Sequence, residues 1–171
     1  MLLLNRYGLG GLICAVLVTL PAAVVPAWGA DDPGFERMAI CQDSWLDWQK
    51  NDPARLKVFA DRFHAAFSPH DNDPYFLPKA NVSVAGLRVV QAYPGSVGMG
   101  VGFSLLVDAT FDKAKQTLAK QLGKPLVKCD ASDGMKTCEL QIAEQRTITL
   151  MAPDDPKNSQ TLIGCYYFYE K

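Results

Sequence analysis

The stretch CDASDGMKTC, residues 129–138, predicts a β-hairpin closed by a disulfide. Asp133-Gly134 is a preferred pair for a two-residue type I′ turn, in which both turn residues take positive φ. With that turn, Cys129 faces Cys138 as a non-hydrogen-bonded pair, and the short Cα separation of such a pair suits a disulfide. The stretch therefore predicts two neighbouring antiparallel strands with a Cys129–Cys138 bridge.

The other cysteines point to a second bridge. The chain has five cysteines, and Cys14 lies in an apolar leader, so Cys41 and Cys165 remain to pair with each other. The alternative, a four-thiolate metal site, needs closely spaced pairs such as C-x-x-C. The sequence contains no such pair, and we expect two disulfides and no free thiol in the mature protein.

Residues 1–29 have the order of a secretory signal peptide. Arg6 precedes an uncharged apolar stretch, and Ala27-Trp28-Gly29 supplies small residues at a cleavage site. The stretch is also long enough to serve as an uncleaved membrane anchor. Pro21 within it and the acidic residues that begin at Asp31 favour cleavage instead. We therefore expect a periplasmic or secreted protein, with residues 30–171 as a single domain and no stable membrane span after cleavage.

Charge and composition limit the class of partner. The formal net charge of the whole chain is −1, and loss of Arg6 with the leader makes it −2. The sequence has no run of Lys and Arg, whereas nucleic-acid binding needs clustered positive charge. We expect no nucleic-acid partner and no cofactor; the expected partner is another protein or a component of the cell envelope.

The periodicity of apolar residues predicts an α+β fold with helices on one face of an antiparallel sheet. In 147–152, for example, Ile148, Leu150 and Ala152 alternate with polar residues, as in a half-buried strand. Proline after Asp52 predicts a helix start. The expected order is α-α-β-β-α-β-β-β-β with about six strands: helices over 35–50, 53–67 and 110–122, and strands over 82–93, 99–108, 126–130, 137–143, 147–152 and 160–169.

Two of these strands carry the candidate binding surface. The last strand is apolar on both faces, which fits either a central buried strand or an exposed aromatic row. The glycines of the strand over 99–108 leave one face almost without side chains, so a neighbouring ring, a sheet bend or a partner must approach closely there. The candidate residues are Gly98, Gly100, Gly102, Ser104, Tyr166, Tyr167, Phe168 and Tyr169.

The recognisable catalytic motifs fail on inspection. A phosphate-binding glycine loop leads into a helix, whereas GMGVGF leads into a strand. PGSVG resembles a nucleophile elbow around Ser96, but its first residue is Pro94 and no helix follows. No catalytic residue is assigned.

Acidic and histidine side chains give only weak candidates. His70, Asp71 and Asp73 lie in the polar loop 68–81 and could hold a metal, although the calcium-loop pattern is incomplete. The carboxylates of Asp43, Asp47 and Glu139 are available for hydrolysis, but nothing in the sequence pairs them. No metal site is assigned.

These observations favour an exported, non-enzymatic binding protein, such as an inhibitor or immunity-type partner of an envelope-acting protein. One alternative is a small envelope hydrolase that uses a carboxylate or the 68–81 loop. Another is a structural or small-ligand-carrying envelope protein. A sizeable apolar cavity between helices and sheet would favour the last alternative.

Overall fold

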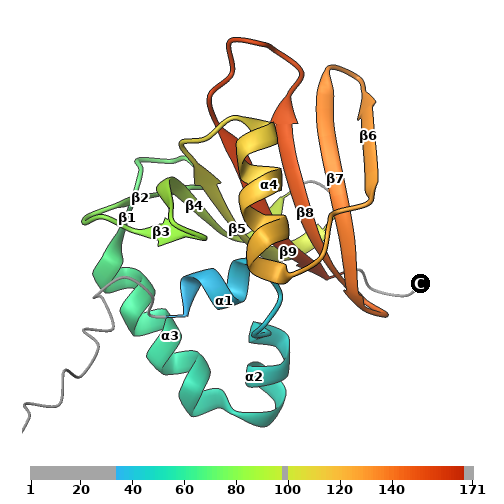
Figure 1. The fold of residues 1–171 in the computed structure, drawn as a ribbon. Coiled ribbons are helices and arrows are strands. Elements are labelled where there is room, and N and C mark those ends of the chain that lie inside the picture. Colours follow the sequence, from blue (N-terminus) through green and yellow to red (C-terminus); the bar gives the residue numbers. More distant parts are fainter. Residues whose placement is uncertain (1–33, 98–99, 168–171) are drawn as a thin grey trace, which may run out of the picture.

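A computed structural model describes residues 34–97 and 100–167 (Figure 1). The predicted signal peptide and the candidate residues Gly98, Phe168 and Tyr169 lie outside this part of the chain. The helices are α1 (Phe35–Ala39), α2 (Trp45–Asn51), α3 (Pro53–Ala66) and α4 (Phe111–Leu122). The strands are β1 (Phe67–Pro69), β2 (Phe76–Pro78), β3 (Ser83–Val84), β4 (Leu87–Val97), β5 (Gly100–Val107), β6 (Lys128–Ser132), β7 (Met135–Ala143), β8 (Arg146–Pro153) and β9 (Thr161–Tyr167).

The strands form one antiparallel sheet in the order β1-β2-β4-β5-β9-β8-β7-β6, with β3 paired to β4. The predicted α+β class and antiparallel sheet are confirmed. The sheet has nine strands instead of about six, because three short strands form near the loop predicted over 68–81. The chain returns at its end to the middle of the sheet, where β9 lies between β5 and β8.

The prediction of one helix over 35–50 is wrong, because the chain forms α1 and α2 there. Cys41 has a φ of 59°, which is incompatible with a continuous α-helix. The hydroxyl of Ser44 then accepts a hydrogen bond of 3.1 Å from the Asp47 amide, a capping interaction that starts a new helix. Among the described residues, no helix is both long and apolar enough to cross a membrane.

The predicted hairpin over 129–138 is confirmed. Asp133 and Gly134 have φ values of 53° and 73°, as a type I′ turn requires. β6 and β7 pair with Cys129 opposite Cys138, and a disulfide joins these two residues.

Between the strands predicted over 82–93 and 99–108, the sequence predicts a turn at Pro94-Gly95, and this prediction is wrong. Both residues lie inside β4, where Pro94 is opposite Phe103 and Gly95 is opposite Gly102 on β5. The pairing continues to Val97 opposite Gly100. Proline lacks the amide hydrogen that a sheet bond uses, but β4 can hold it because the described pairing with β2 is limited to Ala92, so the side of β4 away from β5 is an unpaired edge at Pro94.

The helices pack on one face of the sheet, and α1 and α4 lie on the same side in Figure 1. Phe35 of α1 is fully buried and stacks on Phe103 of β5 with ring centroids 6.4 Å apart. The disulfide between Cys41 and Cys165, the second pair expected from the sequence, joins the segment after α1 to the central strand β9. The core thus forms between the N-terminal helices and the middle of the sheet.

Candidate functional site

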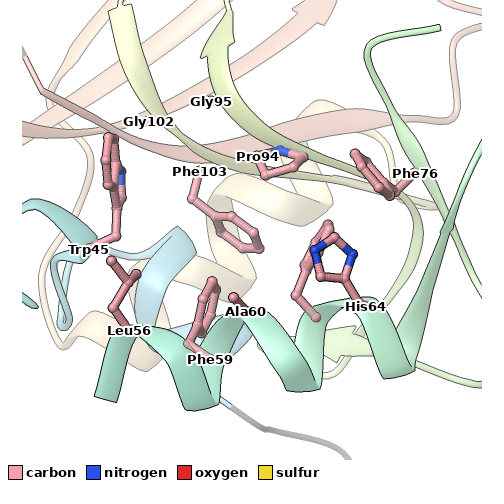
Figure 2. Close-up of a pocket in the computed structure, with 11 residues that line it drawn as sticks. Trp45, Leu56, Phe59, Ala60, His64, Phe76, Pro94, Gly95, Gly102 and Phe103 are labelled. Carbon is pink, nitrogen blue, oxygen red and sulfur yellow. The ribbon is translucent and has the colours of Figure 1, made fainter. Parts of the chain in front are cut away.

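An apolar groove of about 280 Å³ lies between α3 and the sheet (Figure 2). It is open to solvent, and its lining comes from one face of α3 and from α2, β2, β4 and β5. The lining residues are Trp45, Leu56, Phe59, Ala60, Phe63, His64, Phe76, Pro94, Gly95, Gly102 and Phe103.

Aromatic rings form much of the groove wall. Phe103 is buried and packs edge to face against Phe59, with ring centroids 5.5 Å apart. Phe63 is also buried and contacts Phe76 at 5.0 Å. Phe59 and Phe76 are half-buried, so parts of their rings stay open to a ligand. Interlocked rings give a firm wall of low polarity, which suits an apolar ligand.

The position of α3 follows from a strong local start signal. Pro53 occupies the first turn, and the Asp52 carboxylate accepts a hydrogen bond of 3.1 Å from the Arg55 amide. The helix start fixes which face of α3 lines the groove, and on that face Ala60 lies between the larger side chains of Phe59 and Phe63. Ala60 and the two sheet glycines Gly95 and Gly102 line the same groove with almost no side chain. On the helix wall, the short side chain of Ala60 leaves space that a larger one would fill.

Of the predicted binding surface, Gly102, Ser104, Tyr166 and Tyr167 are buried. Gly102 is opposite Tyr166 and Ser104 is opposite Gly164, so the residues do meet across β5 and β9. Ser104 has no exposed surface and Tyr166 is only 4 % exposed. An exposed aromatic row is therefore ruled out for Tyr166, because its ring lies over Gly164: a Cβ built on that glycine would be 2.9 Å from a Tyr166 ring carbon. Gly102 keeps a functional position only as part of the groove lining.

Tyr167 is also buried, on the side of β9 that carries Cys165 and Ile163. Its ring contacts Trp45 edge to face at 6.2 Å. Burial raises its pKa, although the nearby Ser44 hydroxyl lowers it in part. Its hydroxyl is buried close to Ser44 and to the backbone of Trp45, but it makes no hydrogen bond of good geometry with either. Tyr167 is thus a core residue, which agrees with the alternative of a central buried strand that the sequence left open.

The candidate metal residues of the 68–81 loop are only partly brought together. His70 Nδ1 lies 2.9 Å from an Asp73 carboxylate oxygen, and both side chains are exposed. The His70 ring also stacks on Tyr75 at 4.9 Å. Asp71 takes a φ of 42° in the turn between them. Within residues 34–97 and 100–167, no three His, Cys, Asp or Glu side chains form a possible metal cluster.

The other reactive candidates lie in separate places. Asp43 pairs with Arg37 at 2.7 Å, Asp47 approaches Arg146 at 3.6 Å, and Glu139 pairs with Lys128 at 3.0 Å. The first contact joins α1 to the segment that follows it. The second joins α2 to β8, and the third joins β6 to β7. Ser96 lies within strand β4, opposite Val101. The described geometry gives Asp43, Asp47 and Glu139 structural contacts and places none of these three in the groove lining.

Sequence reasoning missed the groove itself. The apolar stripe Leu56, Phe59, Ala60 and Phe63 was visible, but a stripe of this kind indicates only a buried helix face. The sequence feature that could have indicated a groove was Ala60, a small residue within this stripe of larger apolar side chains. Its meaning depended on which strands faced the helix, and that followed from the pairing of β4 with β5.

No protein-family model matches the chain, and no curated protein or solved structure matches it either.

Proposed function

We propose that this is an exported, non-enzymatic binding protein that holds a small apolar molecule in the groove between α3 and the sheet. The groove is the observation that carries the proposal: it is hollow, lined by aromatic rings, and lies between helices and sheet. Ligand pockets are typically concave and mostly apolar, with few polar groups.

A small molecule fits the surface better than a protein partner does. The exposed large apolar side chains, among the described residues, are Val58, Leu77, Val127 and Met135. They come from α3, β2 and the two ends of the β6–β7 hairpin. Stable protein interfaces need a contiguous patch with a buried core. The aromatic strand that favoured an inhibitor or immunity-type role is buried at Tyr166 and Tyr167.

Export is supported by the two disulfides, since such bonds persist in oxidising compartments. The test is mass spectrometry of the protein from the envelope and medium of cells that express the full chain. We expect the mass of residues 30–171 less four cysteine hydrogens. A chain that keeps its leader, or that carries free thiols, would contradict export with cleavage.

Ligand binding is tested with the neutral dye N-phenyl-1-naphthylamine, whose fluorescence rises in apolar surroundings. Ala60→Trp places an indole in the groove, and we expect dye affinity to fall at least about tenfold through loss of buried contact. Ala65→Trp is the matched control, because Ala65 lies on the same helix but is exposed and outside the groove lining.

The outcomes separate cleanly. Saturable binding to the wild type and to Ala65→Trp, with loss in Ala60→Trp, supports the proposal. Absence of saturable binding to the wild type would remove it, as would equal binding to all three proteins. Urea unfolding of each variant shows whether a lost signal reflects a filled groove or an unfolded chain.

A further inference from the structure

One end of the groove is polar, in contrast to the rest of its lining. His64 is the only groove-lining residue with an ionisable side chain. Figure 2 shows its ring at one end of the groove beside Phe76, with Trp45 at the opposite end. The His64 ring lies 6.4 Å from the Phe76 ring, and the residue is exposed. A ligand in the groove therefore meets apolar surface along its length and an imidazole at one end.

A lysine ammonium group lies against the backbone of His64. Lys79 Nζ donates a hydrogen bond of 2.6 Å to the backbone carbonyl oxygen of His64. The Lys79 amide also donates to the carbonyl of Ala66, which fixes the lysine at the C-terminal end of α3. The ammonium group thus stays next to the residue that closes the groove.

The positive charge here has no carboxylate against it. In the described part of the chain, neither His64 nor Lys79 forms an ion pair with an acidic side chain. The nearest acids along the sequence are engaged elsewhere: Asp61 pairs with Lys57 at 2.6 Å and Asp73 with His70 at 2.9 Å. An imidazole N–H donor and an ammonium group at the end of an apolar groove complement an anionic head group.

We propose that the ligand is an amphipathic monocarboxylate of the fatty-acid type. Its hydrocarbon chain lies along Phe59 and Phe103 towards Trp45, and its carboxylate accepts a hydrogen bond from His64 in the field of Lys79. This inference rests on the proposed function, since it assigns a chemical class to the ligand of the same groove. It adds the orientation of the ligand and the residues that select its head group.

The test compares three ligands with one chain length and different head groups: octanoate, 1-octanol and octylammonium. Each displaces N-phenyl-1-naphthylamine from protein purified from cells that express the full chain. We expect octanoate to bind about three- to tenfold more tightly than 1-octanol, as partly exposed charge-assisted contacts allow. Octylammonium should bind most weakly, because the Lys79 ammonium group repels its positive charge.

Two substitutions locate the preference. His64→Gln with Lys79→Gln should remove the preference, because octanoate should lose much more affinity than 1-octanol, whose contacts are mainly with the apolar lining. A variant that fails to fold would lose both ligands, so retained 1-octanol binding is the internal control. Lys113→Gln is the matched control, because Lys113 is an exposed lysine of α4 that lies outside the groove lining and takes part in no ion pair among the described residues.

The inference and the proposed function can fail separately. Equal binding of octanoate and 1-octanol by the wild type overturns the carboxylate inference and leaves an apolar groove. Tighter binding of octylammonium overturns it as well, and so does an octanoate preference that survives the double substitution. Absence of dye binding, with no direct binding of any of the three ligands by calorimetry, overturns both.

Discussion

The hydroxyl of Ser104 donates a hydrogen bond of 2.9 Å to the hydroxyl of Tyr166, which is 62 residues further along the chain. The two strands that carry them, β5 and β9, are neighbours in the middle of the sheet. Gly164 lies directly opposite Ser104, and the Tyr166 ring covers it. Glycine is needed here because the hydroxyl pair and the ring occupy the space of a side chain.

Glycine substitutions on these strands should therefore destabilise the fold unequally. At Gly102, an added Cβ would lie 2.1 Å from the backbone oxygen of Cys165, and a backbone atom of a central strand cannot move aside. At Gly164, the nearest atom is the Ser104 hydroxyl at 2.5 Å, on a side chain that can be removed. We expect Gly102→Ala to cost about 3 kcal/mol of unfolding free energy or more, and Gly164→Ala to cost less.

Urea unfolding measures both variants, and a second substitution checks the cause. Ser104→Gly should recover part of the stability lost in Gly164→Ala, and should recover none in Gly102→Ala. Equal losses in the two single variants, or no recovery in the Gly164 pair, would contradict the close approach seen between β5 and β9.

The two buried tyrosines should respond differently to loss of the hydroxyl. Tyr166→Phe removes the partner of a fully buried Ser104 hydroxyl, which should cost about 1–2 kcal/mol at pH 7. Tyr167→Phe removes a buried hydroxyl that has no hydrogen bond, so stability should stay within about 0.5 kcal/mol of the wild type or rise. Thermal and urea unfolding measure the pair, and a greater loss for Tyr167→Phe would show that its hydroxyl has a partner.

The same tyrosines predict a loss of stability at alkaline pH. Burial raises the pKa of Tyr166 and of Tyr167 above the ordinary tyrosine value of 10.0. Above pH 10, an unfolded chain releases these protons while the folded chain retains them, so unfolding becomes more favourable as pH rises. Stability is unaffected by these groups below that pH. The double Tyr→Phe variant should show a shallower decline between pH 10 and 11, and parallel curves would contradict the assignment.

The two disulfides should contribute unequally to stability. The Cys41–Cys165 bridge spans 124 residues and the Cys129–Cys138 bridge spans 9. In the loop-entropy treatment, the longer loop gives about 5 kcal/mol and the hairpin loop about 3 kcal/mol. Double Cys→Ser variants, measured by urea unfolding, should follow that order. A larger loss from opening the hairpin bridge would show that strain or packing outweighs loop entropy.

The sequence was most informative where structure depends on neighbouring residues. The Asp133-Gly134 turn set the hairpin register and with it the Cys129–Cys138 pair. Proline after Asp52 set the start of α3, and α4 ends at Gly123, a residue type that readily takes the left-handed conformation found there. Such signals act over a few residues, so their physical effect can be read without knowing the fold.

The prediction of one long helix over 35–50 was wrong because part of the information lies far away in the sequence. Its apolar spacing was compatible with a helix, but the Ser44 cap favours a separate one and Cys41 turns towards its bridge with Cys165. The local capping signal was present in the sequence. The direction of the turn was decided by a strand more than one hundred residues away.

The sequence by itself determined the α+β class, the antiparallel hairpins and the Cys129–Cys138 pair, because turn chemistry and side-chain alternation are local properties, and Cys41 with Cys165 followed as the remaining pair. The tertiary structure alone decided that Tyr166 is buried, that Gly102 meets the backbone of Cys165, and that Ala60 borders a groove. Each of these depends on β9 pairing between β5 and β8 and on the sheet face that α3 covers. Contacts between distant segments depend on packing of the whole chain, so an aromatic strand read alone cannot show which of its faces remains open.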